Sequence, residues 1–315
     1  MLKKIVIFIF IVFAVFFVVR KSLKIPSQVS GALETILPDK NTLRFFALGD
    51  FGTNDNQQKK VAQWMESHCQ AQGGVDGLLF LGDHFYPKGV DSSSDPLWEE
   101  VIEKTYLSKP CLSRAKIYPV LGNHDYKGNP QAQINRSAMS SKWFMPYRFY
   151  SLKFENKLKI VALDTVRTDF CFMKDTCAFD FMNYALEKKD TRWTVAMGHF
   201  PLASSSPKGG DHTGDTFWLK KIKERVCNNS DAWLSGHAHH MEHRSISGCQ
   251  SEAFVSGAGG SRNDKIDRRK VKEFARSENG FLELEVKFEK IIFSFIGKNS
   301  KILYRYVKRK ESSDG

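Results

Sequence analysis

One stretch of the sequence decides the fold: it reads LRFFALGDFG and spans residues 43–52. Its first six residues are mostly apolar and predict a β-strand, and Gly49 and Asp50 follow directly. Continuous apolar runs of this length are typical of strands that are covered on both faces. A carboxylate just beyond such a strand lies at the carboxyl edge of the sheet, where α/β proteins bind ligands. The stretch therefore predicts an α/β fold with a ligand site at this edge.

The same arrangement recurs four times along the chain. Further strand-like runs end in Gly82-Asp83-His84-Phe85-Tyr86, Gly122-Asn123-His124-Asp125, Gly198-His199 and Gly236-His237-Ala238-His239. The glycines allow the sharp turns that a close approach of backbone requires. A single motif of this kind is commonly a turn cap. Five of them in order favour one shared site, which offers two carboxylates, a phenol, an amide oxygen and three imidazoles.

These ligand types suit two neighbouring metal ions, and a site of this kind hydrolyses phosphate esters. We expect Asp83 to bridge the metals, because a carboxylate has two oxygens to share. The first metal would also be bound by Asp50, Tyr86 and His239, and the second by Asn123, His199 and His237. A metal-bound hydroxide would attack the phosphate. His124 is the candidate proton donor to the leaving group, and His212 is a second candidate.

The remaining strands and helices predict a layered domain. Strands are expected at 77–81, 117–121, 159–163, 193–197 and 232–235, helices at 56–69 and 95–106, and a meander at 281–288, 291–296 and 302–307. Such a pattern favours two sheets with helices on the outside. We divide the chain into an N-terminal signal or anchor (1–24), a linker (25–41), a catalytic domain (42–310) and a polar tail (311–315).

The N-terminus predicts export. Ile5 to Val19 is an unbroken apolar run with basic residues on both sides. This is the pattern of a signal peptide, and it is short for a bilayer span, which takes roughly 20 residues. Either a cleaved signal or an anchor at residues 5–19 would place the catalytic domain outside the cytoplasm, in a periplasmic, extracellular or lumenal compartment.

Six cysteines fit an exported chain, and none lies in a Cys-x-x-Cys pair. The positions of the cysteines next to neighbouring strands predict Cys69–Cys111 and Cys227–Cys249, and a small loop predicts Cys171–Cys177. Buried free thiols are the alternative.

The net charge of +12 lies mainly in residues 1–24, 261–275 and 301–315. A solvated basic surface is the simplest interpretation. No recognition motif supports nucleic-acid binding, whereas a basic rim that attracts anionic phosphate substrates is a further alternative.

Together these motifs resemble those of the purple acid phosphatases, calcineurin-like metallophosphoesterases, and most of all their small, tartrate-resistant type. The resemblance covers residues 42–310 and includes the tyrosine of the GDxxY motif. It implies a four-layer αββα sandwich of two mixed sheets flanked by helices. It also implies an Fe(III) ion with a divalent Fe, Zn or Mn ion, held by the residues assigned above. Apart from the resemblance, we expect a monomer. Position 84 is His, where the small type often has Asn, and this difference suggests an altered phosphate pocket or an altered pH optimum.

The resemblance implies an acid phosphatase that acts on small phosphate monoesters. A metallophosphodiesterase or nucleotide pyrophosphatase on the same scaffold is the alternative among enzymes. A non-catalytic membrane anchor protein is a third possibility, but relatives of that kind typically lose metal ligands, and all seven positions are retained here.

Overall fold

Two β-sheets face each other in the computed structural model, which describes residues 33–36, 40–166, 175–207 and 216–310. Within these residues the eight-stranded sheet has the order β1-β5-β6-β7-β8-β10-β9-β11 and the six-stranded sheet the order β14-β13-β12-β2-β3-β4. The strands of the first sheet are β1 (Leu33–Ile36), β5 (Tyr150–Phe154), β6 (Leu158–Ala162), β7 (Trp193–Met197), β8 (Ala232–Ser235), β10 (Glu252–Ser256), β9 (Met241–Arg244) and β11 (Phe274–Arg276). Those of the second are β14 (Ile302–Arg309), β13 (Lys290–Ile296), β12 (Phe281–Val286), β2 (Leu43–Leu48), β3 (Gly77–Phe80) and β4 (Lys116–Pro119).

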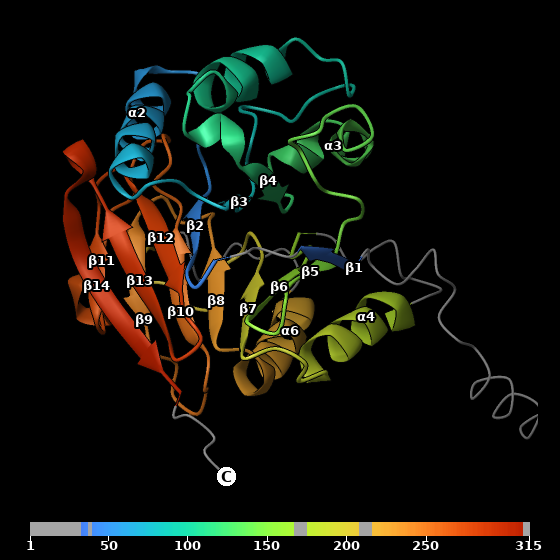
Figure 1. Ribbon diagram of the computed structural model, residues 1–315, viewed down its shortest axis with the longest axis vertical. Helices are drawn as coiled ribbons and strands as arrows, with labels where there is room; N and C mark the ends of the chain where they lie inside the picture. Colours follow the sequence, from blue (N-terminus) through green and yellow to red (C-terminus); the bar gives the residue numbers. More distant parts are fainter. Residues whose placement is uncertain (1–32, 37–39, 167–174, 208–215, 311–315) are drawn as a thin grey trace, which may run out of the picture.

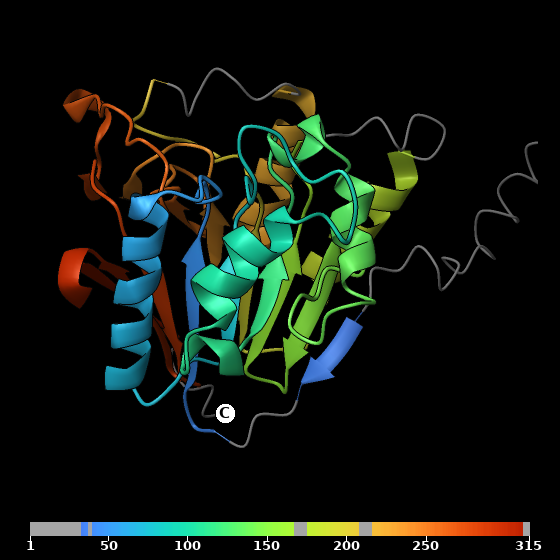
Figure 2. The same ribbon diagram turned by 90° about the horizontal axis from the view of Figure 1, so that it is seen from above.

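Helices cover both outer faces of this pair of sheets. Figure 1 shows α2 (Asn56–Ala71) and the π-helical segment η1 (Trp98–Leu107) on one side, and α4 (Asp175–Glu187) and α6 (Thr216–Asn229) on the other. In Figure 2, seen from above, α2 and η1 lie in front of the strands and α6 lies behind them. Short helices follow β4 (η3, Asp125–Lys127, and α3, Pro130–Arg136). Both sheets are mixed. In the six-stranded sheet, β2 pairs parallel with β3 and antiparallel with β12. In the eight-stranded sheet, β10 pairs parallel with β8 and antiparallel with β9. The predicted αββα layering is confirmed.

The strands that lead to the predicted motifs, such as β2, β3, β7 and β8, are mostly apolar because both of their faces are buried. Phe45 and Phe46 point to opposite faces of β2, and neither is exposed. One cluster of buried side chains fills the space between the sheets and beneath α2 and η1. A second cluster, which includes Trp233 of β8 and Ile222 of α6, lies beneath the opposite helices.

Some boundaries differ from the predicted ones. Helix η1 begins at Trp98 rather than Asp95, because the Asp95 carboxylate accepts a hydrogen bond from the backbone N–H of Leu97 (2.9 Å) and forms a turn there. Strand β14 continues to Arg309, which pairs with Lys290. Residues 33–36, within the segment assigned to the linker, form β1 and pair with β5.

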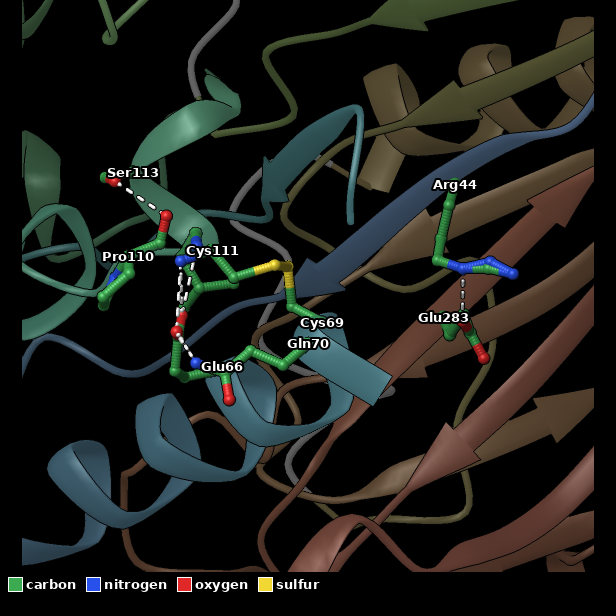
Figure 3. The surroundings of a disulfide bond; sticks show 9 residues. Arg44, Glu66, Cys69, Gln70, Pro110, Cys111, Ser113 and Glu283 are labelled. Carbon is green, nitrogen blue, oxygen red and sulfur yellow. Dashed lines mark hydrogen bonds and ion pairs between the residues drawn. A yellow bond between two sulfur atoms is a disulfide. The ribbon is translucent and has the colours of Figure 1, made fainter. Parts of the chain in front are cut away.

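Two of the three predicted disulfides are formed. Cys69 at the end of α2 bonds to Cys111, and Cys227 of α6 bonds to Cys249. Figure 3 shows that Glu66 lies next to the first disulfide and accepts hydrogen bonds from the backbone N–H of Cys111. The predicted pair Cys171–Cys177 involves a residue outside the described part of the chain.

Among the described residues, none of the helices is both long and apolar enough to cross a bilayer. The run Ile5–Val19 lies outside those residues.

Replacing both cysteines of a disulfide by serine should lower the free energy of unfolding. The loops closed by the bonds span 42 and 22 residues, so the loss of chain entropy in the unfolded state predicts about 3 to 4 kcal/mol for each pair. Urea unfolding of the two double variants measures this. Unchanged unfolding midpoints in both variants would show that the disulfides add no stability.

Candidate metal centre

The five predicted motifs meet at one edge of the sandwich. They follow β2, β3, β4, β7 and β8, and backbone hydrogen bonds join neighbouring loops within each sheet. The backbone N–H of Asp50 donates to the carbonyl of Gly82 (3.0 Å), and that of Gly236 donates to His199 (3.0 Å). The position of each loop is therefore set by its neighbours as well as by its own strand.

Three candidate ligands have a backbone conformation that residues other than glycine rarely adopt. Asp50, Asp83 and His237 have φ values of 60°, 55° and 64°. Hydrogen bonds hold these turns: the backbone N–H of His237 donates to Asp50 Oδ2 at 2.7 Å. Strained backbone of this kind is concentrated at functional sites, where the surrounding structure holds it in place.

Four of the candidate ligands form a first cluster. The Tyr86 hydroxyl lies 3.3 Å from Asp50 Oδ1, 3.0 Å from Asp83 Oδ2 and 3.4 Å from His239 Nε2. His239 Nε2 is also 3.4 Å from Asp50 Oδ1. Two carboxylates, a phenol and an imidazole thus face one small volume.

The remaining three form a second cluster beside the first. Asn123 Oδ1 lies 3.0 Å from His199 Nε2 and 3.1 Å from His237 Nδ1. His199 Nε2 is 3.5 Å from Asp83 Oδ1. Asp83 therefore directs one oxygen towards each cluster, which is the arrangement that a bridging carboxylate requires.

The charges of the site fit bound cations. Asp50 and Asp83 are buried, and in the described part of the chain neither pairs with a lysine or an arginine; their ion-pair partners are His239 and His199. Burial, with a smaller contribution from Asp83, raises the pKa of Asp50 to about 7. Buried carboxylates of this kind are commonly paired or bound to metal. Suitable atoms of Asp50, Asp83 and His199 all lie within 4.8 Å of one another.

The imidazoles are oriented to accept a metal. Burial lowers the pKa values of His199 and His237 to about 3, so both rings are neutral and keep a free lone pair. Burial opposes protonation of His239, but the Asp50 carboxylate raises its pKa to about 9. His199 Nδ1 donates to the carbonyl of Leu81 (2.8 Å), which turns Nε2 towards the cluster.

His124, the candidate proton donor, lies beside the clusters. Its Nδ1 donates to the carbonyl of Pro87 (2.6 Å), and its ring centre is 4.4 Å from that of Tyr86. Lys127 Nζ lies 3.2 Å from both of its ring nitrogens. The second candidate, His212, lies outside the described residues.

His84 does not face the two clusters of candidate ligands. Its side chain is completely buried and its ring packs edge-on against Trp143 at 5.2 Å, while Nδ1 contacts Gln133 Oε1 (2.9 Å). Because the ring belongs to the core, it cannot contact a bound phosphate.

Asp125 has an organising role that motif reading did not assign. Its buried carboxylate accepts hydrogen bonds from the backbone N–H groups of Asp83 (2.9 Å), His84 (3.1 Å) and Gly122 (2.8 Å), and from Gln133 Nε2 (2.9 Å). One side chain thus ties the loop after β3 to the loop after β4. The sequence shows Asp125 directly after Gly122-Asn123-His124, but only the fold shows which groups its carboxylate binds.

Asp125→Asn should weaken metal binding without changing any candidate ligand. The amide loses one acceptor oxygen and the negative charge, so the Asp83 turn loosens; changes in such supporting residues cost about 10- to 100-fold in metal affinity. Titration of metal-free protein with Zn²⁺ or Mn²⁺ measures the change. Asp91→Asn, at an exposed site, is the matched control, and equal affinities in both variants would contradict the role of Asp125.

Comparisons with known proteins agree with this geometry. The family model for calcineurin-like phosphoesterases matches residues 43–241. Tartrate-resistant acid phosphatase type 5 of Sus scrofa is 28% identical over 89% of this chain and 87% of its own length. The same enzyme of Oryctolagus cuniculus is 31% identical over 64% and 68%, and purple acid phosphatase 17 of Arabidopsis thaliana is 23% identical over 86% and 85%.

The fold is also found in solved structures. GAP50, the anchor in the inner membrane complex of Plasmodium, superposes with a TM-score of 0.74 at 22% identity, over 87% of this chain and 91% of its own. Purple acid phosphatase PPD1 from yellow lupin superposes with a TM-score of 0.65 at 14% identity, over 87% and 55%. This chain belongs to the calcineurin-like phosphoesterase family, and tartrate-resistant purple acid phosphatases are among its relatives.

Proposed function

We propose that the protein is an acid phosphatase that hydrolyses phosphate monoesters at a dinuclear metal centre. The observation that carries the proposal is the position of Asp83 between two clusters of metal-binding side chains. The family match and the acid phosphatase relatives support the same class of reaction.

The two clusters differ in a way that favours two different ions. The first holds the phenol of Tyr86 and the carboxylates of Asp50 and Asp83, and so suits a hard trivalent ion such as Fe(III). The second offers the neutral Asn123, His199 and His237 together with Asp83, and suits divalent Fe, Zn or Mn. Such a pair of ions, when bound, lowers the pKa of water and neutralises the charge of a phosphate group.

The protein's own residues would complete the reaction. A leaving alkoxide needs a proton, and His124 lies at the rim of the first cluster with Nδ1 committed to Pro87. Its Nε2 is the atom that can pass a proton to the leaving oxygen. Lys127 adds a positive charge next to this ring and favours an anionic substrate there.

An anchoring role is the second candidate, because GAP50 superposes on this chain. That likeness extends to the fold alone at this identity. The convergence of all seven metal-binding side chains favours an enzyme, because an anchor needs no such site. Two disulfides support an exported protein, and we infer that residues 5–19 attach it to the membrane unless they are cleaved.

Asp83→Asn should abolish hydrolysis of phenyl phosphate. The amide removes the negative charge that both clusters share. We expect a loss of at least about 100-fold in kcat/KM, because substituting a residue that only supports a metal ligand already costs up to about 100-fold in activity. Initial rates and the metal content per chain are measured together. The exposed Asp91→Asn variant should behave as the parent protein. Full activity of Asp83→Asn would refute the metal mechanism, whereas a parent protein that hydrolyses no phosphate ester would favour the anchoring role.

Tyr86→Phe should remove a visible absorption band from the iron-loaded protein. A phenolate bound to Fe(III) absorbs visible light by charge transfer, whereas a phenyl ring cannot coordinate the metal. Tyr147→Phe changes an exposed tyrosine and should leave the band in place. A band that persists in Tyr86→Phe would show that Tyr86 is not the source of the absorption.

A further inference from the structure

A cavity opens beside the first cluster and is not used by the chemistry described above. Its volume is about 510 Å³, and its wall includes His239, Ser206, Ser261, Arg262, Asp264 and Lys265. This size is within the range of small-molecule sites. His239 lies between the first cluster and this cavity: its Nε2 faces Tyr86, and 19% of its side chain is exposed. A substrate held at the metal centre could therefore extend into this cavity.

The wall carries two cations that the described part of the protein does not neutralise. Arg262 and Lys265 are exposed, and neither side chain has an ion-pair or hydrogen-bond partner among the described residues. The carboxylate of the wall, Asp264, is buried and already engaged: its Oδ2 accepts from the backbone N–H of His239 (3.1 Å) and from Ser206 Oγ (2.9 Å). The cavity therefore has positive charge available for an anion.

A buried hydroxyl between the cavity and the candidate metal centre also lacks a hydrogen-bond partner of standard length within the described part of the chain. Ser261 is 5% exposed, and its backbone N–H donates to the carbonyl of Asp50 (3.0 Å), which fixes its place. Its Oγ lies near the Tyr86 phenol but makes no hydrogen bond of standard length to the described residues. An unpaired buried hydroxyl is costly, and an oxygen atom of a ligand in the cavity would satisfy it.

We propose that this cavity binds a second anionic group of the substrate. The preferred substrates are then phosphate monoesters whose leaving group carries another phosphate or a carboxylate. Arg262 and Lys265 would bind this second group through charge-assisted hydrogen bonds, with Ser261 donating to an oxygen between the two ends. The inference rests on the metal site of the proposed function and adds the substrate class.

A general positive field is the competing explanation, because residues 261–275 contain further basic side chains. Such a field would strengthen binding of every anion and would weaken steeply with salt. A subsite instead distinguishes ligands with two anionic groups from those with one. The experiment must therefore measure a ratio of affinities rather than a single affinity.

The test uses the metal-loaded full chain and two phosphonates that cannot be hydrolysed. Calorimetry compares propane-1,3-diphosphonate with propylphosphonate in four proteins: the parent, Arg262→Ala/Lys265→Ala, Arg262→Lys/Lys265→Arg, and Arg114→Ala/Lys189→Ala. The last removes one arginine and one lysine that are exposed and that precede β4 and β7, at the opposite edge of the sheets. Phenyl phosphate and 4-carboxyphenyl phosphate are assayed alongside.

We expect the diphosphonate to bind the parent protein about tenfold more tightly, a preference that removal of Arg262 and Lys265 should largely abolish. The charge-conserving variant and the Arg114→Ala/Lys189→Ala control should retain it. A ratio that is unchanged in Arg262→Ala/Lys265→Ala would overturn the subsite, whether both affinities stay the same or both fall by the same factor. If the ratio behaves as expected but phenyl phosphate is not hydrolysed, the subsite stands and the proposed activity fails.

Discussion

The Asp83 carboxylate divides its two oxygens between two clusters of side chains, and the structure around it serves to hold that position. Oδ2 faces Tyr86 and Oδ1 faces His199. The group is buried and repels its neighbour Asp50, so the arrangement costs free energy unless cations are bound there. Its turn is maintained by Asp125, which also bonds to the loop after β4. This combination of buried charge and rigid support is what a dinuclear centre requires.

The sandwich explains how loops far apart in the chain reach this carboxylate. β2, β3 and β4 lie parallel in one sheet, and β7 and β8 lie parallel in the other. Their carboxyl ends therefore come together at one edge, and each loop leaves its strand through a glycine. Because both faces of the strands are packed in apolar cores, the edge cannot shift without disturbing the interior. The geometry of the proposed metal site thus depends on the same packing that stabilises the fold.

The sequence predicted the parts of this arrangement that depend on local pattern. The apolar run at 43–48 followed by Asp50 was enough to place a strand and a site at its end, and its recurrence indicated a shared centre. The contacts of Asp125 could not be read in this way, since its partners are backbone groups of another loop. The burial of His84 depends on Trp143, which is distant in sequence. The cavity wall joins Ser206 to residues 261–265, a proximity that only the tertiary structure creates.

The central claim is that two metal ions lie on either side of Asp83, and anomalous X-ray diffraction tests it most directly. Crystals of the purified protein, grown with iron and zinc, would be measured at the absorption edges of both metals. The account predicts two peaks about 3.5 to 4 Å apart, one beside Tyr86 and one beside Asn123, with Asp83 between them. A map with no peak at the clusters, or with one peak bound away from Asp83, would contradict it.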